Sequence, residues 1–202
     1  MRALVTERGI LTRSANLLTG RSLGIGLRDV EIPRPKIAKN EVLIRVRAVA
    51  LNPIDFKFVD FIAPPGGIAG CDFAGEIEEI GEEASGAWKI KDRVAGFVQG
   101  GIDKGRGSFA EYIKLEGDLV WKIPDTMSYK EASTFGIPAA TAMQALYLHL
   151  DVPWPDKIGT QRTWNKTPVF IYAGSSAVGL FAIQMAKKAG LTVVTTASPH
   201  SF

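Results

Sequence analysis

The sequence is poor in the residues that build disulfide frameworks and metal sites. It contains one cysteine, Cys71, and two histidines, His149 and His200, among 202 residues. A single cysteine excludes an internal disulfide framework and every zinc motif that needs paired cysteines. The two histidines are far apart in the chain, so a histidine-rich metal site is not expected.

Blocks of like charge are also lacking. Lys and Arg total 24 against 21 Asp and Glu, which gives a net charge of +3, and these charges are scattered. Without a basic block, nucleic acid is a poor candidate for a partner. The composition, with 46% hydrophobic and 22% charged residues, is that of a folded protein with a sizeable core.

No segment has the character of a signal peptide or of a membrane span. The N-terminus has no apolar run long enough for a signal peptide. Residues 167–186 carry no charge, but Gly174, Ser175 and Ser176 lie in their middle, and β-branched and aromatic residues cluster before them. A buried strand followed by a buried helix explains this stretch better than a span. We therefore expect a cytosolic protein with no membrane partner.

The first half of the chain has the pattern of a small β domain. Residues 41–50 alternate apolar residues with Arg45 and Arg47, which is the period of a half-buried strand. Gly- and Pro-rich loops separate further predicted strands, which are residues 74–80, 92–98 and 108–115. The pattern predicts a barrel-like β domain over residues 1–125.

The pattern changes from residue 126 onward. Ser128 and Glu131 have the spacing of a capping box and predict a helix through Phe135, which Pro138 interrupts before a second helix over residues 139–150. The polar residues 151–168 include three prolines and are predicted as a loop or linker. One βαβ unit follows, with its strand, helix and second strand over residues 169–173, 177–189 and 191–197.

The turn inside this βαβ unit is the clearest candidate for a ligand site. A strand that leads into a tight turn and a helix directs backbone N–H groups and the positive end of the helix dipole toward a bound pyrophosphate. Gly174 is expected to give the tight turn and Gly179 the close helix packing, while Ser176 replaces the middle glycine of G-x-G-x-x-G. The alternative is a close-packed structural turn that binds nothing.

The residues after the second strand indicate which dinucleotide would fit. An NAD site usually has Asp or Glu there, to hold the ribose 2′-hydroxyl. This chain instead has hydroxyl and imidazole side chains, at Thr195, Thr196, Ser198, His200 and Ser201. Such groups accept a 2′-phosphate that a carboxylate would repel, so NADPH is favoured. The alternative is a frayed, polar end of the chain.

Several motifs in order resemble a known family. They are EVLIRVRAVALNPIDFK, IAGCDFAGEI, DRVAGF, GSFAEY and AATAMQAL, followed by AGSSAVG. Together they resemble the zinc-independent quinone oxidoreductase and enoyl reductase branch of the medium-chain dehydrogenase/reductases. They are similar in particular to the fungal enoyl reductases that act in trans on polyketide synthases. The resemblance implies an α/β chain with a GroES-like β-barrel domain, followed over residues 126–202 by the start of a Rossmann nucleotide-binding domain.

The resemblance also implies a site without a metal. Asn52 stands where zinc-dependent relatives have a cysteine ligand, and Cys71 and Asp72 stand where they have a His-Glu pair. These residues do not form a zinc ligand set, so Cys71 is expected to be buried and unreactive. Lys91 replaces the glycine that usually precedes Asp-Arg-Val in the family, which leaves the geometry of that turn open.

The family likeness places the candidate site residues in four places. The loop of Asn52, Ile54, Asp55, Phe56 and Lys57 faces the nicotinamide and its ribose. Asn52 is then able to donate to a substrate carbonyl, and Lys57 to bind ribose hydroxyls or phosphate. Thr141 lines the cleft between cofactor and substrate, so the catalytic candidates are Asn52, Lys57 and Thr141. The pyrophosphate turn comprises Gly174, Ser175, Ser176, Ala177, Val178 and Gly179, and the 2′-phosphate region comprises Ser198, Pro199, His200 and Ser201. Without the resemblance, the loop would be a simple turn and Thr141 an ordinary helix residue.

The implied chemistry is NADPH-dependent 1,4-reduction of an α,β-unsaturated thioester or ketone, free or attached to a polyketide synthase. A quinone oxidoreductase is one alternative, and a non-catalytic remnant or interaction module is another. A complete doubly wound domain has two βαβαβ halves, for which residues 169–202 are too few. We therefore expect a truncated family member that binds NADPH weakly or not at all.

Overall fold

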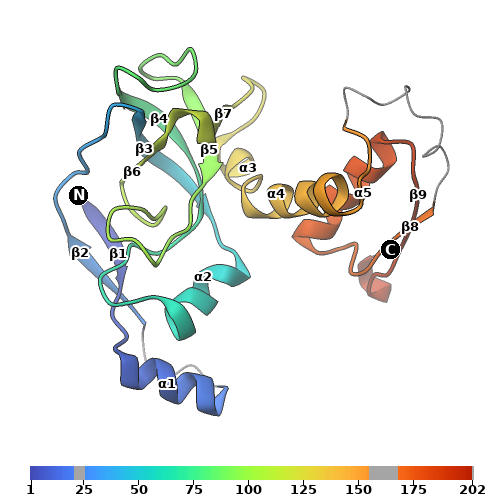
Figure 1. The fold of residues 1–202 in the computed structure, drawn as a ribbon, viewed down its shortest axis with the longest axis horizontal. Coiled ribbons are helices and arrows are strands. Elements are labelled where there is room, and N and C mark those ends of the chain that lie inside the picture. The colour runs from blue at the N-terminus through green and yellow to red at the C-terminus, as the bar shows by residue number, and fades with distance from the viewer. Residues whose placement is uncertain (21–25, 155–167, 202) are drawn as a thin grey trace. The chain divides into compact units, whose positions relative to one another are not determined.

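The computed structural model describes residues 1–20, 26–154 and 168–201 (Figure 1). These residues form two compact units, Met1–Gly136 and Ile137–Phe202, and each is described by itself. No helix in these ranges is long and apolar enough to cross a bilayer.

The first unit is built on antiparallel strands. Two of them, β1 (Arg2–Thr6) and β2 (Leu27–Glu31), pair with each other. The others form a five-stranded sheet in the order β6-β3-β4-β5-β7. Its members are β3 (Glu41–Ala50), β4 (Asp72–Ile80), β5 (Arg93–Phe97), β6 (Tyr112–Glu116) and β7 (Val120–Lys122). The predicted β domain is confirmed.

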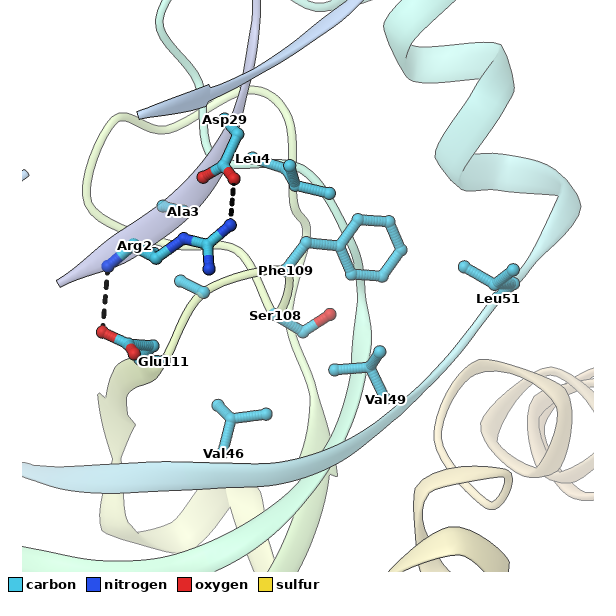
Figure 2. Close-up of a pocket in the computed structure, with 11 residues that line it drawn as sticks. Arg2, Ala3, Leu4, Asp29, Val46, Val49, Leu51, Ser108, Phe109 and Glu111 are labelled. Atoms are coloured by element: carbon cyan, nitrogen blue, oxygen red, sulfur yellow. Dashed lines mark hydrogen bonds and ion pairs between the residues drawn. The ribbon is translucent and has the colours of Figure 1, made fainter. Parts of the chain in front are cut away.

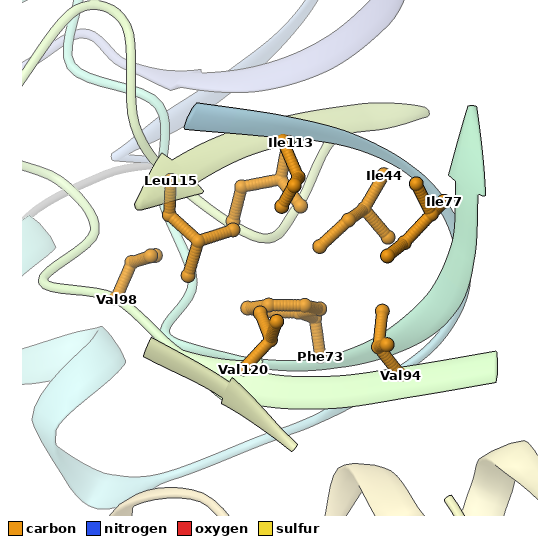
Figure 3. Packing of buried hydrophobic residues seen from close by; sticks show 9 residues of the cluster. Ile44, Phe73, Ile77, Val94, Val98, Ile113, Leu115 and Val120 are labelled. Atoms are coloured by element: carbon orange, nitrogen blue, oxygen red, sulfur yellow. The ribbon is translucent and has the colours of Figure 1, made fainter. Parts of the chain in front are cut away.

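The core of the first unit lies on the inner face of this curved sheet. Alternate residues of β3 and β4 point into it, as the period of two requires. Figure 3 shows the aromatic ring of Phe73 among aliphatic side chains that come from all five strands. The buried members are Val42, Ile44, Phe73, Ile77, Val94, Val98, Ile113, Leu115 and Val120.

One predicted strand begins later than expected. The sequence pattern predicts a strand from Ser108, whereas β6 starts at Tyr112. The amides of Ser108 and Phe109 instead donate to the carbonyls of Gly70 and Ala69, and Phe109 accepts from Leu4. These bonds to residues 69 and 70 and to β1 hold Ser108 and Phe109 outside the main sheet.

Short helices complete the first unit. They are α1 (Ile10–Thr19), α2 (Pro53–Lys57), a π-helical turn (Phe58–Ile62), a 3₁₀ turn (Gly117–Leu119) and α3 (Tyr129–Ser133). The capping box before α3 is confirmed, because Glu131 N donates to Ser128 Oγ at 3.2 Å and Ser128 N donates to Glu131 Oε2 at 2.8 Å. Helix α3 packs against β3 and β4 and therefore lies with the first unit. The domain boundary after residue 125 stays a prediction.

The second unit contains the predicted βαβ arrangement. Its strands β8 (Pro168–Ile171) and β9 (Thr192–Thr195) are parallel, and α5 (Ala177–Lys188) connects them. Helix α4 (Ile137–Met143), which continues as a π-helical turn (Gln144–His149), packs against α5. A 3₁₀ turn (Pro199–Ser201) follows β9.

Of two further predictions for this region, one is wrong and the other lies mostly outside the described residues. Pro138 does not interrupt a helix but lies in the first turn of α4, where the missing N–H has no helical partner to lose. The break between the two helices falls at residues 134–136 instead. Most of the predicted loop, residues 155–167, lies outside the described residues.

Candidate functional site

In the turn between β8 and α5, the residue with the left-handed backbone conformation is Ala173 and not Gly174. Ala173 has a φ of 58°, in the left-handed region that a side chain disfavours, whereas Gly174 does not have a positive φ. Gly174 is required for a different reason, since a Cβ there would lie 2.2 Å from Thr195 Oγ1. Gly174 therefore contributes to the turn through its missing side chain, and Ala173 contributes the left-handed backbone conformation.

Gly179 and Ser176 fix the start of the helix. A Cβ at Gly179 would lie 2.4 Å from the carbonyl oxygen of Ala173, so only glycine allows α5 to approach the turn this closely. The amide of Gly179 donates to Ser176 Oγ at 3.1 Å, and Ser176 is the N-cap of α5. The serine that replaces the middle glycine of the motif therefore caps the helix.

The first turn of α5 keeps amides for a ligand. Among the hydrogen bonds of the described residues, none has the amide of Ser175, Ala177 or Val178 as its donor. Ser175 and Ala177 are exposed, and the helix dipole adds partial positive charge at this end. The turn thus fits the pyrophosphate of a dinucleotide, which offers acceptor oxygens and negative charge.

Two threonines expected near a 2′-phosphate have structural roles. Thr195 Oγ1 donates to the carbonyl of Ile171 at 2.6 Å, and Ala173 N donates to Thr196 Oγ1 at 2.9 Å. These bonds fasten the end of β9 to the turn. Beyond them Ser198, Pro199 and His200 are exposed, so their contact with a phosphate stays a prediction. The side chain of Ser201 lies outside the described residues.

The loop of the first unit begins a helix. Asn52 is the N-cap of α2, and its backbone amide donates to Asp55 Oδ2 at 2.7 Å. Asp55 is buried by this arrangement, while Phe56 and Lys57 are exposed and Ile54 is half-buried. Contact of these residues with a cofactor stays a prediction, and the carboxylate of Asp55 is engaged in the cap.

The side chain of Asn52 has a partner that the sequence analysis missed. Its Nδ2 donates to Asp72 Oδ2 at 2.9 Å, and Asp72 is fully buried. Asp72 opens β4, opposite Ala50 at the end of β3. An acidic residue directly before Phe73, Ala74 and Gly75, which carry no polar side chain, was the available signal.

Cys71, next to Asp72, has the expected character. It is 1% exposed, and burial, together with the nearby carboxylates of Asp55 and Asp72, raises the pKa of its thiol to about 12. Such a thiol stays protonated and is a poor nucleophile and metal ligand. Within the described ranges, no three or more His, Cys, Asp or Glu side chains are arranged to hold a metal.

Thr141 lies on α4 in the second unit. Its side chain is exposed, and Oγ1 donates to the carbonyl of Ile137 one turn earlier, at 2.7 Å. The oxygen keeps its acceptor capacity toward a ligand. The structure thus groups Asn52 to Lys57 in one unit, and Thr141, the turn and the residues after β9 in the other.

A cavity of about 490 Å³ lies elsewhere in the first unit (Figure 2). Its walls come from β1, from β3 and its end, and from residues 108–111. Apolar side chains dominate, and the ion pair of Arg2 with Asp29 lies on one side of it. None of the predicted site residues lines this cavity.

Known proteins are similar to this chain in sequence and in fold. Residues 38–125 match the alcohol dehydrogenase GroES-like domain. The chain is 42% identical over 170 residues to the trans-enoyl reductase TOXD of Cochliobolus carbonum, which is 83% of this chain and 56% of that protein. The chain spans about half the length of the curated relatives it matches.

Two solved structures extend the comparison. The quinone oxidoreductase of Coxiella burnetii superposes with a TM-score of 0.73 at 29% identity, over 100% of this chain and 57% of that one. A mycobacterial protein solved in complex with NADPH gives 0.70 at 26% identity, over 100% of this chain and 54% of that one. With the GroES-like match and the βαβ turn, these likenesses make the chain similar, in sequence and in fold, to the enoyl reductases and quinone oxidoreductases among the medium-chain dehydrogenase/reductases.

Proposed function

We propose that the protein takes part in the NADPH-dependent reduction of an α,β-unsaturated carbonyl, such as the enoyl thioester carried by a polyketide synthase. The observation that carries this proposal is the 42% identity with a trans-enoyl reductase over 83% of the chain. The free amides at the start of α5 support it, because they suit a dinucleotide. A cytosolic location remains a prediction.

The residues of the chain would bind and orient the reactants. The amides of Ser175, Ala177 and Val178 would hold the pyrophosphate, and Ser198 and His200 would hold the 2′-phosphate. Lys57, exposed at the end of α2, is able to bind ribose hydroxyls or phosphate, and Thr141 offers an acceptor oxygen toward the substrate. NADPH, when bound, would supply a hydride to the β-carbon, and a proton would add at the α-carbon to complete the reduction.

A charge added at the turn tests this proposal. Ala177→Asp places a carboxylate at the first position of α5, where the helix dipole favours it, so the fold is kept. The same charge repels a pyrophosphate, and we expect the dissociation constant for NADPH, measured by calorimetry, to rise about tenfold or more. Gln184→Glu adds the same charge at an exposed position two turns later and serves as the control. Equal affinity in all three proteins would contradict the assigned site.

Turnover separates the candidate reactions. The chain is mixed with NADPH and either a crotonyl thioester or a quinone, and consumption of NADPH is followed. Faster consumption with the thioester supports enoyl reduction. Consumption with the quinone alone supports the quinone oxidoreductase reading, which the 29% identity with the Coxiella protein favours. NADPH binding without turnover on either substrate, or no binding at all, contradicts enoyl reduction by this chain and leaves the interaction module.

A further inference from the structure

The cavity of about 490 Å³ in the first unit has a buried hydroxyl in its wall. Ser108 lines the cavity although it is 0% exposed, so it lies at the cavity floor. Figure 2 shows its Oγ turned toward the space between Phe109 and Val49. Among the described residues, none forms a hydrogen bond with this oxygen. A buried hydroxyl without a partner destabilises a fold, so its presence at the floor of a cavity indicates a ligand.

The rest of the cavity wall is mainly apolar. Its charged side chains belong to three residues on one side of it, Arg2, Asp29 and Glu111. These residues bind one another, because the Arg2 guanidinium pairs with Asp29 and the Arg2 backbone amide donates to Glu111 Oε2 at 2.9 Å. A buried water molecule makes about three hydrogen bonds, and Ser108 alone provides too few partners for one.

Backbone hydrogen bonds hold the wall around Ser108 in place. The amide of Ser108 donates to the carbonyl of Gly70 at 2.9 Å, and the amide of Leu4 donates to the carbonyl of Phe109 at 2.8 Å. The ring of Phe109 packs directly on Gly70, where a Cβ would lie 2.1 Å from Phe109 Cδ1. The hydroxyl and the apolar wall are therefore already ordered, so a ligand does not lose affinity by ordering them.

We propose that this cavity is a further ligand site, which takes a small, neutral and mainly apolar molecule with one hydrogen-bonding oxygen, and that Ser108 binds this oxygen. The apolar wall suits the body of such a molecule. A charged ligand is disfavoured, because Arg2 is already bound by two carboxylates and a charge at the floor would have no counter-ion. The inference does not depend on the proposed function, since the cavity lies within Met1–Gly136 and is separate from the turn before α5.

A matched pair of small molecules tests the role of the hydroxyl. Acetophenone and ethylbenzene have the same ring and the same chain length, but only acetophenone carries a carbonyl oxygen. In NMR titrations of the ¹⁵N-labelled full chain, we expect both to shift the amide signals of Phe109 and Ala110, and acetophenone to bind about three- to tenfold more tightly. In Ser108→Ala the two should bind alike. Equal affinity of both molecules for the unsubstituted chain, or no binding of either, overturns the proposal.

A larger side chain in the wall tests the location of the site. Val49 lies on β3, lines the cavity and is 39% exposed, so Val49→Phe narrows the cavity without crowding the core. We expect both molecules to bind about tenfold more weakly to it. Val194→Phe makes the same change at an exposed position on β9 and serves as the control. Unchanged binding to Val49→Phe shows that the molecules bind elsewhere, which also overturns the proposal.

Thermal unfolding without a ligand gives an independent measurement. Ser108→Ala removes a buried hydroxyl that has no partner, so the midpoint temperature should rise by about 2–4 °C while acetophenone binding weakens. Ser133 is the matched control, because it is 2% exposed and its Oγ donates to the carbonyl of Lys130 at 2.9 Å. Ser133→Ala should therefore lower the midpoint and leave binding unchanged. A fall in both variants means that the Ser108 hydroxyl is bonded within the fold, and the assignment to a ligand fails.

Discussion

Lys91 occupies a backbone conformation that suits glycine. Its φ is 73°, and its amide donates to the carbonyl of Ile77 in the turn that leads into β5. A left-handed residue with a Cβ costs about 1 kcal/mol or more. The turn therefore keeps the geometry that a glycine would adopt, at a cost in stability.

Replacement of Lys91 should stabilise the protein. Lys91→Gly relieves the steric cost, and the ion pairs that it loses, with Glu78 at 3.0 Å and Glu76 at 3.9 Å, involve an exposed lysine and contribute little. We expect the free energy of unfolding to rise by about 0.5–1 kcal/mol after the greater entropy of glycine in the unfolded chain is deducted. Urea denaturation measures this change. Lys91→Ala loses the ion pairs but keeps the strain, so an equal gain in that control would refute the explanation.

The thiol of Cys71 should give the folded state an alkaline limit. Its pKa is raised from an ordinary value of 9.0 to about 12, so the folded state retains a proton that the unfolded state releases. The contribution to stability is therefore complete below pH 9 and is lost as the pH rises from 9 toward 12. Unfolding curves over this range, compared with those of Cys71→Ala, isolate the effect, because the pKa values of Tyr129 and Tyr147 are raised too. Curves that stay parallel would contradict it.

Helix α1 is the element with the most unusual orientation. Its leucines face outward, with Leu11 85% and Leu18 87% exposed, whereas Asn16 is fully buried. Asn16 Nδ2 donates to the carbonyl of Asp60 at 2.9 Å, and Gly20 closes the helix in a left-handed conformation. A polar side chain thus ties this helix to the unit.

The stability of α1 should follow from Asn16 and not from its leucines. Replacement of both Leu11 and Leu18 by Gln should change the free energy of unfolding by no more than about 0.5 kcal/mol, since neither residue is packed. Asn16→Ala should cost about 1–3 kcal/mol, because it leaves a buried carbonyl without this donor. Chemical denaturation of both variants checks the contrast. A larger loss from the leucine variant would mean that the outward face is covered.

The elements that could be predicted are those that a pattern of residues close together in the sequence specifies. The alternation in residues 41–50 gives β3 with its observed bounds, and the Ser128 and Glu131 spacing gives the start of α3. Helix α1 escaped prediction because contacts distant in sequence hold it, with its apolar residues turned outward.

Within the candidate site, the same limit applies. The sequence indicated the turn at Gly174 and Gly179, but the left-handed residue is Ala173, since the path of the chain from β8 into α5 sets that dihedral angle. The bond from Asn52 to Asp72 depends on the pairing of β3 with β4, which places residue 72 beside residue 50. A side-chain contact that depends on how two strands pair is not visible in a motif of consecutive residues.

At the scale of the whole molecule, the two units differ in how their cores are built. The core of Met1–Gly136 includes a phenylalanine, a leucine and several isoleucines and valines, drawn from five strands. The core of Ile137–Phe202 contains four alanines among its eight buried members. Large side chains bury more apolar area per residue, so the first core contributes more stability.

The first unit should therefore fold by itself. We expect the isolated segment Met1–Gly136 to unfold cooperatively in urea and to show slow hydrogen exchange for the amides of β3, β4 and β5, since their partners all lie within it. Phe73→Ala in the same segment should cost about 3–5 kcal/mol, because it opens a cavity in the centre of the core. Fast exchange throughout these strands in the unsubstituted segment would show that the sheet needs residues beyond Gly136. The hydrogen bonds between its own strands would then not be enough to keep the segment folded.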